Sequence, residues 1–190
     1  MDRGRLREIS KLDFREPGPF LVGLREIEGR VAGSTLPDSV RELRTNSLKT
    51  WREARQAALF CHGLGKRLGA TVSFAREETR DHDFIAQALV DGVPHVVPVQ
   101  LKEVVPTELN PDSTLEGTLG ALTKYADAHE LTVAIHLNRC VRFDPVRLEL
   151  PALGIGAVWV FGTLTEDQSE WGLWGDFMQE PFGTRFSYQT

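Results

Sequence analysis

Two apolar segments rich in β-branched residues meet at the dipeptide Asp91-Gly92. Residues 83–90 read DFIAQALV, and residues 95–105 read HVVPVQLKEVV. Asp-Gly between two such segments predicts a tight β-hairpin, because this turn needs residues that accept a positive φ. Pro98 lacks a backbone donor, so its nitrogen should face an edge of the sheet or a bulge. The fold must therefore include an antiparallel pair of strands here.

The second of these strands carries two polar residues on one side. Gln100 and Lys102 are two positions apart, so they project from the same side, and Leu101 projects from the other. A simple hairpin pairs positions symmetrically about its turn, so the residues opposite Gln100 and Lys102 should lie close to Asp81 or Asp83. Burying a lysine without a partner is costly, and an aspartate on the neighbouring strand would offset that cost. The pattern predicts a cluster of Asp83, Gln100 and Lys102.

Helices are predicted on both sides of this hairpin in the sequence. The segment from Ser47 to about residue 69 lacks proline and is apolar nearly all round at AALFC, which predicts a substantially buried helix with Ser47 as its N-cap. The run Ser113 to Glu116 fits a capping box, and an apolar stripe follows it at Leu115, Leu119, Leu122 and Ala126.

Further strands are predicted where β-forming or continuous apolar residues occur. These segments are residues 70–76, 131–138 and 156–162. The order from residue 47 is therefore helix, three strands, helix and two strands. We expect residues 47–165 to form the core, residues 1–46 to be an N-terminal extension with a strand or short helices, and the aromatic-rich residues 166–190 to pack on the core or in a homodimer.

Composition excludes several classes of protein. The 190 residues suffice for one domain, and 41% hydrophobic with 26% charged residues is typical of a globular chain. The formal charge of -5 argues against non-specific coating of nucleic acid, which needs a broad basic face. No apolar run approaches the roughly 20 residues of a membrane span, and the N-terminus lacks the apolar part of a signal peptide. We expect a cytoplasmic protein that does not act on membranes.

The predicted cluster has a recognisable chemistry. A carboxylate and an amide oxygen, together with strand carbonyls, can ligate a hard divalent cation such as Mg²⁺. The cation would polarise a phosphodiester and lower the pKa of a bound water, while an ammonium group orients that water or stabilises the developing charge. Hydrolysis of a phosphodiester is the reaction that this set of groups favours.

The order of elements from residue 47, with Asp83 at the start of the second strand and QLK at residues 100–102 in the third, resembles the PD-(D/E)xK nuclease superfamily. The resemblance covers roughly residues 47–140. It implies a restriction-endonuclease-like, three-layer α/β/α fold with a central mixed sheet. It also implies hydrolysis of nucleic acid, with DNA as the expected substrate and Mg²⁺ or Mn²⁺ as the cofactor. It also implies that Asp83 and Gln100 bind the metal, that Lys102 assists the attacking water, and that Glu53 on the first helix joins them.

The sequence departs from the pattern of this family at two points. No proline precedes Asp83, and the neutral Gln100 stands where a carboxylate is usual, although related nucleases tolerate glutamine there. Loss of that charge should lower the affinity for a cation. A catalytically inactive nuclease fold that serves as a binding or assembly module is therefore the alternative. A third reading is an unrelated α/β domain whose polar strand residues face solvent.

Other motifs are weaker. His82-Asp83 with His62 could suggest an HD-type phosphohydrolase, but that class is all-helical and His82 precedes a strand. The sequence contains no C-x-x-C pair, which argues against a zinc site. The residues that could form one are Cys61, His62, His136 and Cys140.

Four residues are given no role in the chemistry of the site. We predict that Cys61 and Cys140 are reduced and buried. On the second helix we expect a solvated Lys124 and a packed Tyr125.

Overall fold

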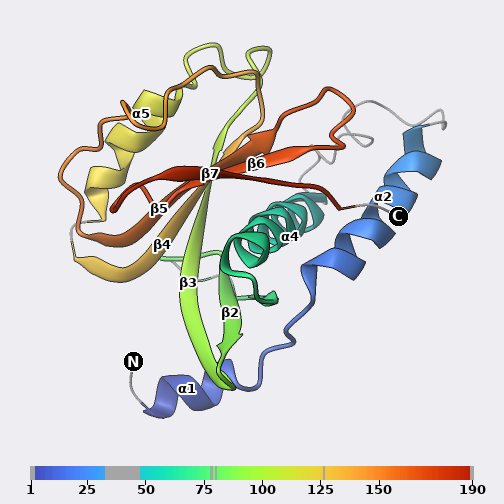
Figure 1. The fold of residues 1–190 in the computed structure, drawn as a ribbon, viewed down its shortest axis with the longest axis vertical. Coiled ribbons are helices and arrows are strands. Elements are labelled where there is room, and N and C mark those ends of the chain that lie inside the picture. The colour runs from blue at the N-terminus through green and yellow to red at the C-terminus, as the bar shows by residue number, and fades with distance from the viewer. Residues whose placement is uncertain (1–2, 33–47, 78, 80, 126, 189–190) are drawn as a thin grey trace.

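The computed structural model describes residues 3–32, 48–77, 79, 81–125 and 127–188 (Figure 1). It is a mixed α/β structure with one seven-stranded sheet. The mixed α/β class agrees with the prediction from the sequence. The elements in chain order are α1 (Arg3–Ile9), α2 (Pro17–Ala32), α4 (Lys49–Leu68), β1 (Val72–Arg76), β2 (Phe84–Val90), β3 (Val93–Val104), α5 (Leu115–Gly120), the 3-10 helix η2 (Ala121–Lys124), β4 (Ala128–Leu137), β5 (Ile155–Thr163), β6 (Trp171–Gly175) and β7 (Phe182–Phe186).

The hairpin predicted at Asp91-Gly92 is present. Both turn residues have positive φ, 52° at Asp91 and 76° at Gly92, and Val90 pairs with Val93 across them. Two positive φ values give the turn the twist of the strands that it joins. The Pro98 nitrogen lies at an unpaired edge, as the sequence predicts. The Val99 carbonyl faces β2, so the Pro98 nitrogen faces away from β2, and β4 pairs with β3 only from Val99 onward.

The strands lie in the sheet in sequence order. β2 pairs antiparallel with β1 on one side and with β3 on the other, whereas β3 and β4 are parallel, and so are β4 and β5. A parallel pair needs a crossover connection, and residues 105–127, which include α5 and η2, provide it between β3 and β4. The sheet is therefore mixed.

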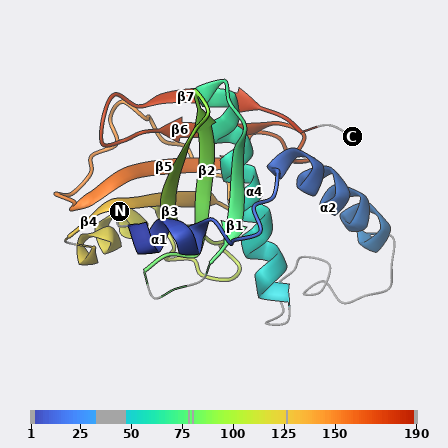
Figure 2. The ribbon, with the colours of Figure 1, turned by 90° about the horizontal axis from the view of Figure 1, so that it is seen from below.

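Strand alternation gives the sheet two apolar faces. One face packs against α4 through a cluster that includes Phe60, Phe84 and Leu101. The sheet curls around this helix, since α4 contacts β1, β2 and β3 on one side and β6 and β7 on the other. Figure 2 shows the curl, with β1–β3 running up the view and β5–β7 running across it. We call the face toward α4 the concave face.

The opposite, convex face is covered by α5, η2 and the segment that follows β4. Its cluster includes Leu119 and Leu122 from the helices and Ile135 and Val160 from the strands. The predicted capping box is wrong by one residue, because Thr114 is the N-cap and accepts a hydrogen bond from the Gly117 N–H at 3.0 Å. The regular helix is short and ends at Gly120, where η2 follows.

The ends of the chain add to this core. α2 packs on α4 and β1, and Arg15 pairs with Phe74 as a one-residue bridge beside β1. Residues 166–190 contain β6 and β7, which extend the sheet beyond β5. Within the described part of the chain, no helix is long and apolar enough to cross a bilayer.

Two predictions about single residues have other outcomes. Cys61 is buried, but Cys140 is exposed in the segment after β4, so its predicted burial is wrong. Ser47, the predicted N-cap, and Ala126, the last residue of the predicted stripe, lie outside the described residues.

Candidate active site on the convex face

Asp83 and Gln100 meet at the open end of the β2–β3 hairpin. Phe84 pairs with Val99, so the register places Asp83 opposite Gln100. Gln100 Nε2 donates a short hydrogen bond to Asp83 Oδ2. The symmetry of the hairpin therefore brings together two residues that are 17 positions apart in the sequence.

One oxygen of Asp83 also completes the β-ladder. Asp83 Oδ2 accepts the N–H of Leu101 at 2.7 Å, at the point where β2 begins and its backbone offers that amide no partner. This bond satisfies a backbone donor at the sheet's end. The other oxygen, Oδ1, has no hydrogen-bond partner among the described residues. The carboxylate thus has one oxygen engaged in structure and one available to a ligand.

The side-chain amide of Gln100 lies between oxygens. Its Nε2 donates to Asp83 Oδ2 and to the Leu101 carbonyl at 3.2 Å, while its Oε1 accepts from the Tyr125 hydroxyl at 3.3 Å. An N–H₂ group that donates to two oxygens marks a place where oxygens gather, as they do around a small cation. Turning the amide over would replace its nitrogen by a third oxygen, and the three oxygens could then ligate a cation beside them. The Tyr125 hydroxyl would then accept from Nε2, since a hydroxyl both donates and accepts.

Lys102 lies on the same convex face, two residues beyond Gln100. Its Nζ is 5.8 Å from the centroid of the Tyr125 ring, and Lys124 Nζ is 5.0 Å from the same centroid. Lys124 is exposed and Tyr125 is partly buried against the convex core, which agrees with the prediction for these two residues. The sequence predicts only packing for Tyr125, and the contact of its hydroxyl with Gln100 is a finding of the structure.

Glu53 is placed differently from the other three predicted site residues. It lies on α4, which packs on the concave face, whereas Gln100 and Lys102 project from the convex face. Its carboxylate pairs with Lys49 Nζ at 3.3 Å. Glu53 begins a stripe at helical spacing that continues through Ala57 and Phe60 and faces the sheet, but it faces the concave side.

Glu103 is two positions from Leu101 along β3, so it projects to the concave side as Leu101 does. Its Oε1 accepts a hydrogen bond from Asn138 Nδ2 at 2.7 Å. This contact ties the ends of the parallel strands β3 and β4 together.

A charged network fixes the segment that precedes Asp83. Glu77 accepts from Arg5 of α1, with Nη1 at 3.0 Å from Oε1, and its Oε2 lies 3.0 Å from His82 Nε2. His82 Nδ1 lies 2.9 Å from Thr79 Oγ1. Burial alone would raise the pKa of Glu77, but the hydrogen bonds from Arg5 and His82 outweigh it and leave that pKa below its ordinary value. The network links α1 to the loop that positions Asp83.

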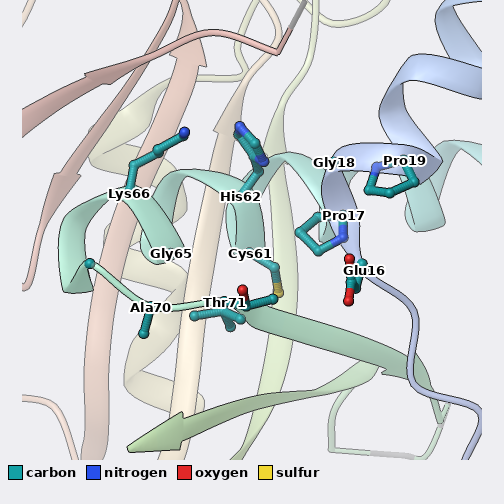
Figure 3. A pocket seen from close by; sticks show the side chains of 12 residues that line it. Glu16, Pro17, Gly18, Pro19, Cys61, His62, Gly65, Lys66, Ala70 and Thr71 are labelled. Carbon is teal, nitrogen blue, oxygen red and sulfur yellow. The ribbon is translucent and has the colours of Figure 1, made fainter.

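A pocket of about 460 Å³ lies elsewhere, between the start of α2 and the second half of α4 (Figure 3). It reaches Val72 at the beginning of β1, whereas Asp83 lies beside the end of that strand. His62 and Lys66 project from one side of α4 in Figure 3, and the buried Cys61 projects from the other. Burial lowers the pKa of His62, whose Nε2 lies 3.2 Å from the Ser187 carbonyl. None of the predicted site residues lines this pocket.

No cluster of three or more His, Cys, Asp or Glu side chains suited to a metal occurs among the described residues. Cation ligands at Asp83 would therefore have to include amide and carbonyl oxygens, which Mg²⁺ accepts. The oxygens present are those of Asp83, Gln100 and the Leu101 carbonyl, and they fit a weakly held hard cation with several waters.

Comparison of the chain with protein-family models, with curated proteins and with solved structures gave no match.

Proposed function

We propose that the protein is a metal-dependent nuclease with a restriction-endonuclease-like, three-layer fold. It hydrolyses nucleic-acid phosphodiesters, and DNA is the proposed substrate. One observation carries this proposal. Asp83 and Gln100 are hydrogen-bonded across the hairpin, with Lys102 next along the same face. They lie within the order α4, β1, β2, β3, α5, β4, and the two helices cover opposite faces of the sheet.

The residues have distinct roles in this proposal. Asp83 Oδ1, Gln100 Oε1 and the Leu101 carbonyl would hold Mg²⁺ or Mn²⁺, after the Gln100 amide has turned over. When bound, the cation polarises the phosphodiester and lowers the pKa of a water. Tyr125 orients the Gln100 amide through its hydroxyl. Glu53 stays outside this set, because its helix covers the other face.

The ammonium group of Lys102 acts on the attacking water and the scissile phosphate. It is a compact charge with three donors, so it can hold a water in place and stabilise the negative charge that develops on the phosphate oxygens. No described carboxylate forms an ion pair with it, and its Nζ lies 5.8 Å from the centroid of the Tyr125 ring. Its donors are therefore available to substrate.

Incubation of the purified protein with supercoiled, linear and branched DNA and with RNA, in millimolar Mg²⁺ or Mn²⁺, tests this function. We expect cleavage that stops when the metal is chelated. We expect Asp83→Asn and Lys102→Ala each to reduce the rate of cleavage by about 100-fold or more. The Glu103→Gln variant is the matched control, since it changes a charge on the same strand but on the opposite face. Cleavage that persists in Lys102→Ala would refute the role of that lysine.

A second candidate is a non-catalytic binding or assembly module with the same fold. The orientation of the Gln100 amide favours it, because Nε2 satisfies Asp83 without any cation. This candidate predicts binding of nucleic acid or of a protein partner with neither cleavage nor stabilisation by metal. Thermal unfolding with and without Mg²⁺ separates the two candidates, since a ligand that binds only the folded state stabilises it by mass action.

A further inference from the structure

Two lysines from different elements converge on one aromatic ring beside the candidate site. Lys102 of β3 and Lys124 of η2 place their Nζ atoms 5.8 Å and 5.0 Å from the centroid of Tyr125. Within the described part of the chain, neither ammonium group forms an ion pair with a carboxylate. The site thus carries two ammonium groups that no carboxylate of the described residues engages directly.

The ring holds these charges in a defined place. Tyr125 packs against the convex core, and its hydroxyl donates to Gln100 Oε1 at 3.3 Å. Attraction of an ammonium group to an aromatic face biases each lysine toward the ring. Both ammonium groups lie close to this one ring, so an anion bound beside it gains the attraction of two positive charges.

The charge of the whole chain makes this pair more significant. A protein with a formal charge of -5 repels a polyanion at long range, so contact with nucleic acid depends on local cations. Lysine is a point charge suited to phosphate, and it needs no fixed geometry of the anion.

We propose that Lys102 and Lys124 together bind the backbone phosphates of a nucleic-acid strand, with Lys102 at the scissile phosphate and Lys124 at a neighbouring one. This inference rests on the proposed function, and it adds the element that receives the substrate: the strand passes over η2 and Tyr125 on the convex face. Tyr125 is then a positioning residue for both lysines.

Binding without cleavage tests this proposal directly. Fluorescence anisotropy with labelled single-stranded and double-stranded oligonucleotides, in chelator and at a series of salt concentrations, gives the Kd and the slope of log K against log salt. We expect Lys124→Gln to weaken binding about 3- to 10-fold at low salt and to reduce the magnitude of the slope by about 0.7–0.9, the value for one lost phosphate contact. Under cleavage conditions we expect Lys124→Gln to raise KM and Lys102→Gln to lower kcat.

Lys66→Gln is the matched control, because Lys66 is an exposed lysine on α4 at the separate pocket and should change neither the Kd nor the slope. Equal Kd and slope for Lys124→Gln and the unsubstituted protein would overturn the proposal even if the protein cleaves DNA. Absence of oligonucleotide binding by the unsubstituted protein would overturn it too. The proposed nuclease function fails separately, if no substrate is cleaved while Lys124→Gln still weakens binding.

Discussion

Replacing Gln100 with glutamate should convert the candidate site from one that is stable without metal to one that needs it. In the metal-free protein, Gln100 Nε2 donates to Asp83 Oδ2 and to the Leu101 carbonyl. A carboxylate at position 100 cannot donate to either oxygen, and it adds a second negative charge against Asp83.

The cost of this change can be estimated from these contacts. Two unit charges about 4 Å apart repel by about 4 kcal/mol at an effective dielectric constant of about 20, and a hydrogen bond to a charged group contributes about 1.5–3 kcal/mol. Gln100 is partly exposed, so water screens the repulsion. We expect Gln100→Glu to destabilise the metal-free fold by about 2–4 kcal/mol. This corresponds to a fall in Tm of about 4–16 °C for a chain of this size.

Divalent cation should reverse the effect, because the added carboxylate raises the affinity of the site. At a cation concentration of about 100 times Kd, the stabilisation is about 2.7 kcal/mol. Thermal unfolding followed by circular dichroism in chelator and in increasing Mg²⁺ measures both quantities. Gln87→Glu makes the same chemical change elsewhere on the hairpin and should show neither effect. A Gln100→Glu protein that is as stable as the unsubstituted one in chelator, or that gains nothing from Mg²⁺, would refute the reasoning.

Two further predictions concern the rest of the fold. Burial and the nearby charge of Arg55 lower the pKa of His136 to about 3, so below pH 6.5 the unfolded chain binds a proton that the folded chain does not. The free energy of unfolding should therefore rise with pH between about 3 and 6.5, by about 1.4 kcal/mol per pH unit from this group. Urea unfolding across this range should show a flatter dependence of that free energy on pH for His136→Phe. Glu77→Ala removes the acceptor shared by Arg5 and His82. We expect the free energy of unfolding to fall by about 1–3 kcal/mol and trypsin to cleave faster within α1 while the sheet stays folded. Unchanged cleavage within α1 would show that the network does not hold this helix.

The sequence predicted the hairpin and its register well, because both follow from local chemistry. Asp91-Gly92 specifies the turn, and the turn then fixes every pair of residues back to Phe84 and Val99. The contact of Asp83 with Gln100 is one step beyond the last of these pairs. Sequence symmetry about a two-residue turn is thus enough to place two residues of the candidate site.

The placement of Glu53 could not be predicted in the same way. The helical stripe that begins at Glu53 indicates which side of α4 faces the sheet, and it is right in that respect, since Ala57 and Phe60 are buried in the concave cluster. Nothing local states which face of the sheet the helix covers. That choice depends on the curl of the whole sheet around α4, which involves strands more than 100 residues away.

The C-terminal strands were not predicted, and α5 is shorter than its apolar stripe predicts, both for reasons of composition. β6 reads WGLWG, where glycine and tryptophan hide the period of a strand, and its pairing with β5 and β7 is non-local. α5 contains Gly117 and Gly120, whose conformational freedom favours a short helix over the longer one that the apolar stripe suggests. Tyr125 gave no signal of its own, because a tyrosine that packs and one that orients an amide look alike in a sequence.

A crystal of the protein soaked in Mn²⁺ and measured for anomalous scattering tests the central claim most directly. The account predicts a peak about 2.0–2.3 Å from an oxygen of Asp83, with the Gln100 amide turned so that its oxygen and the Leu101 carbonyl face the ion and its nitrogen faces Tyr125. No peak at Asp83 under these conditions, or a peak there with the Gln100 nitrogen still against the carboxylate, would contradict it.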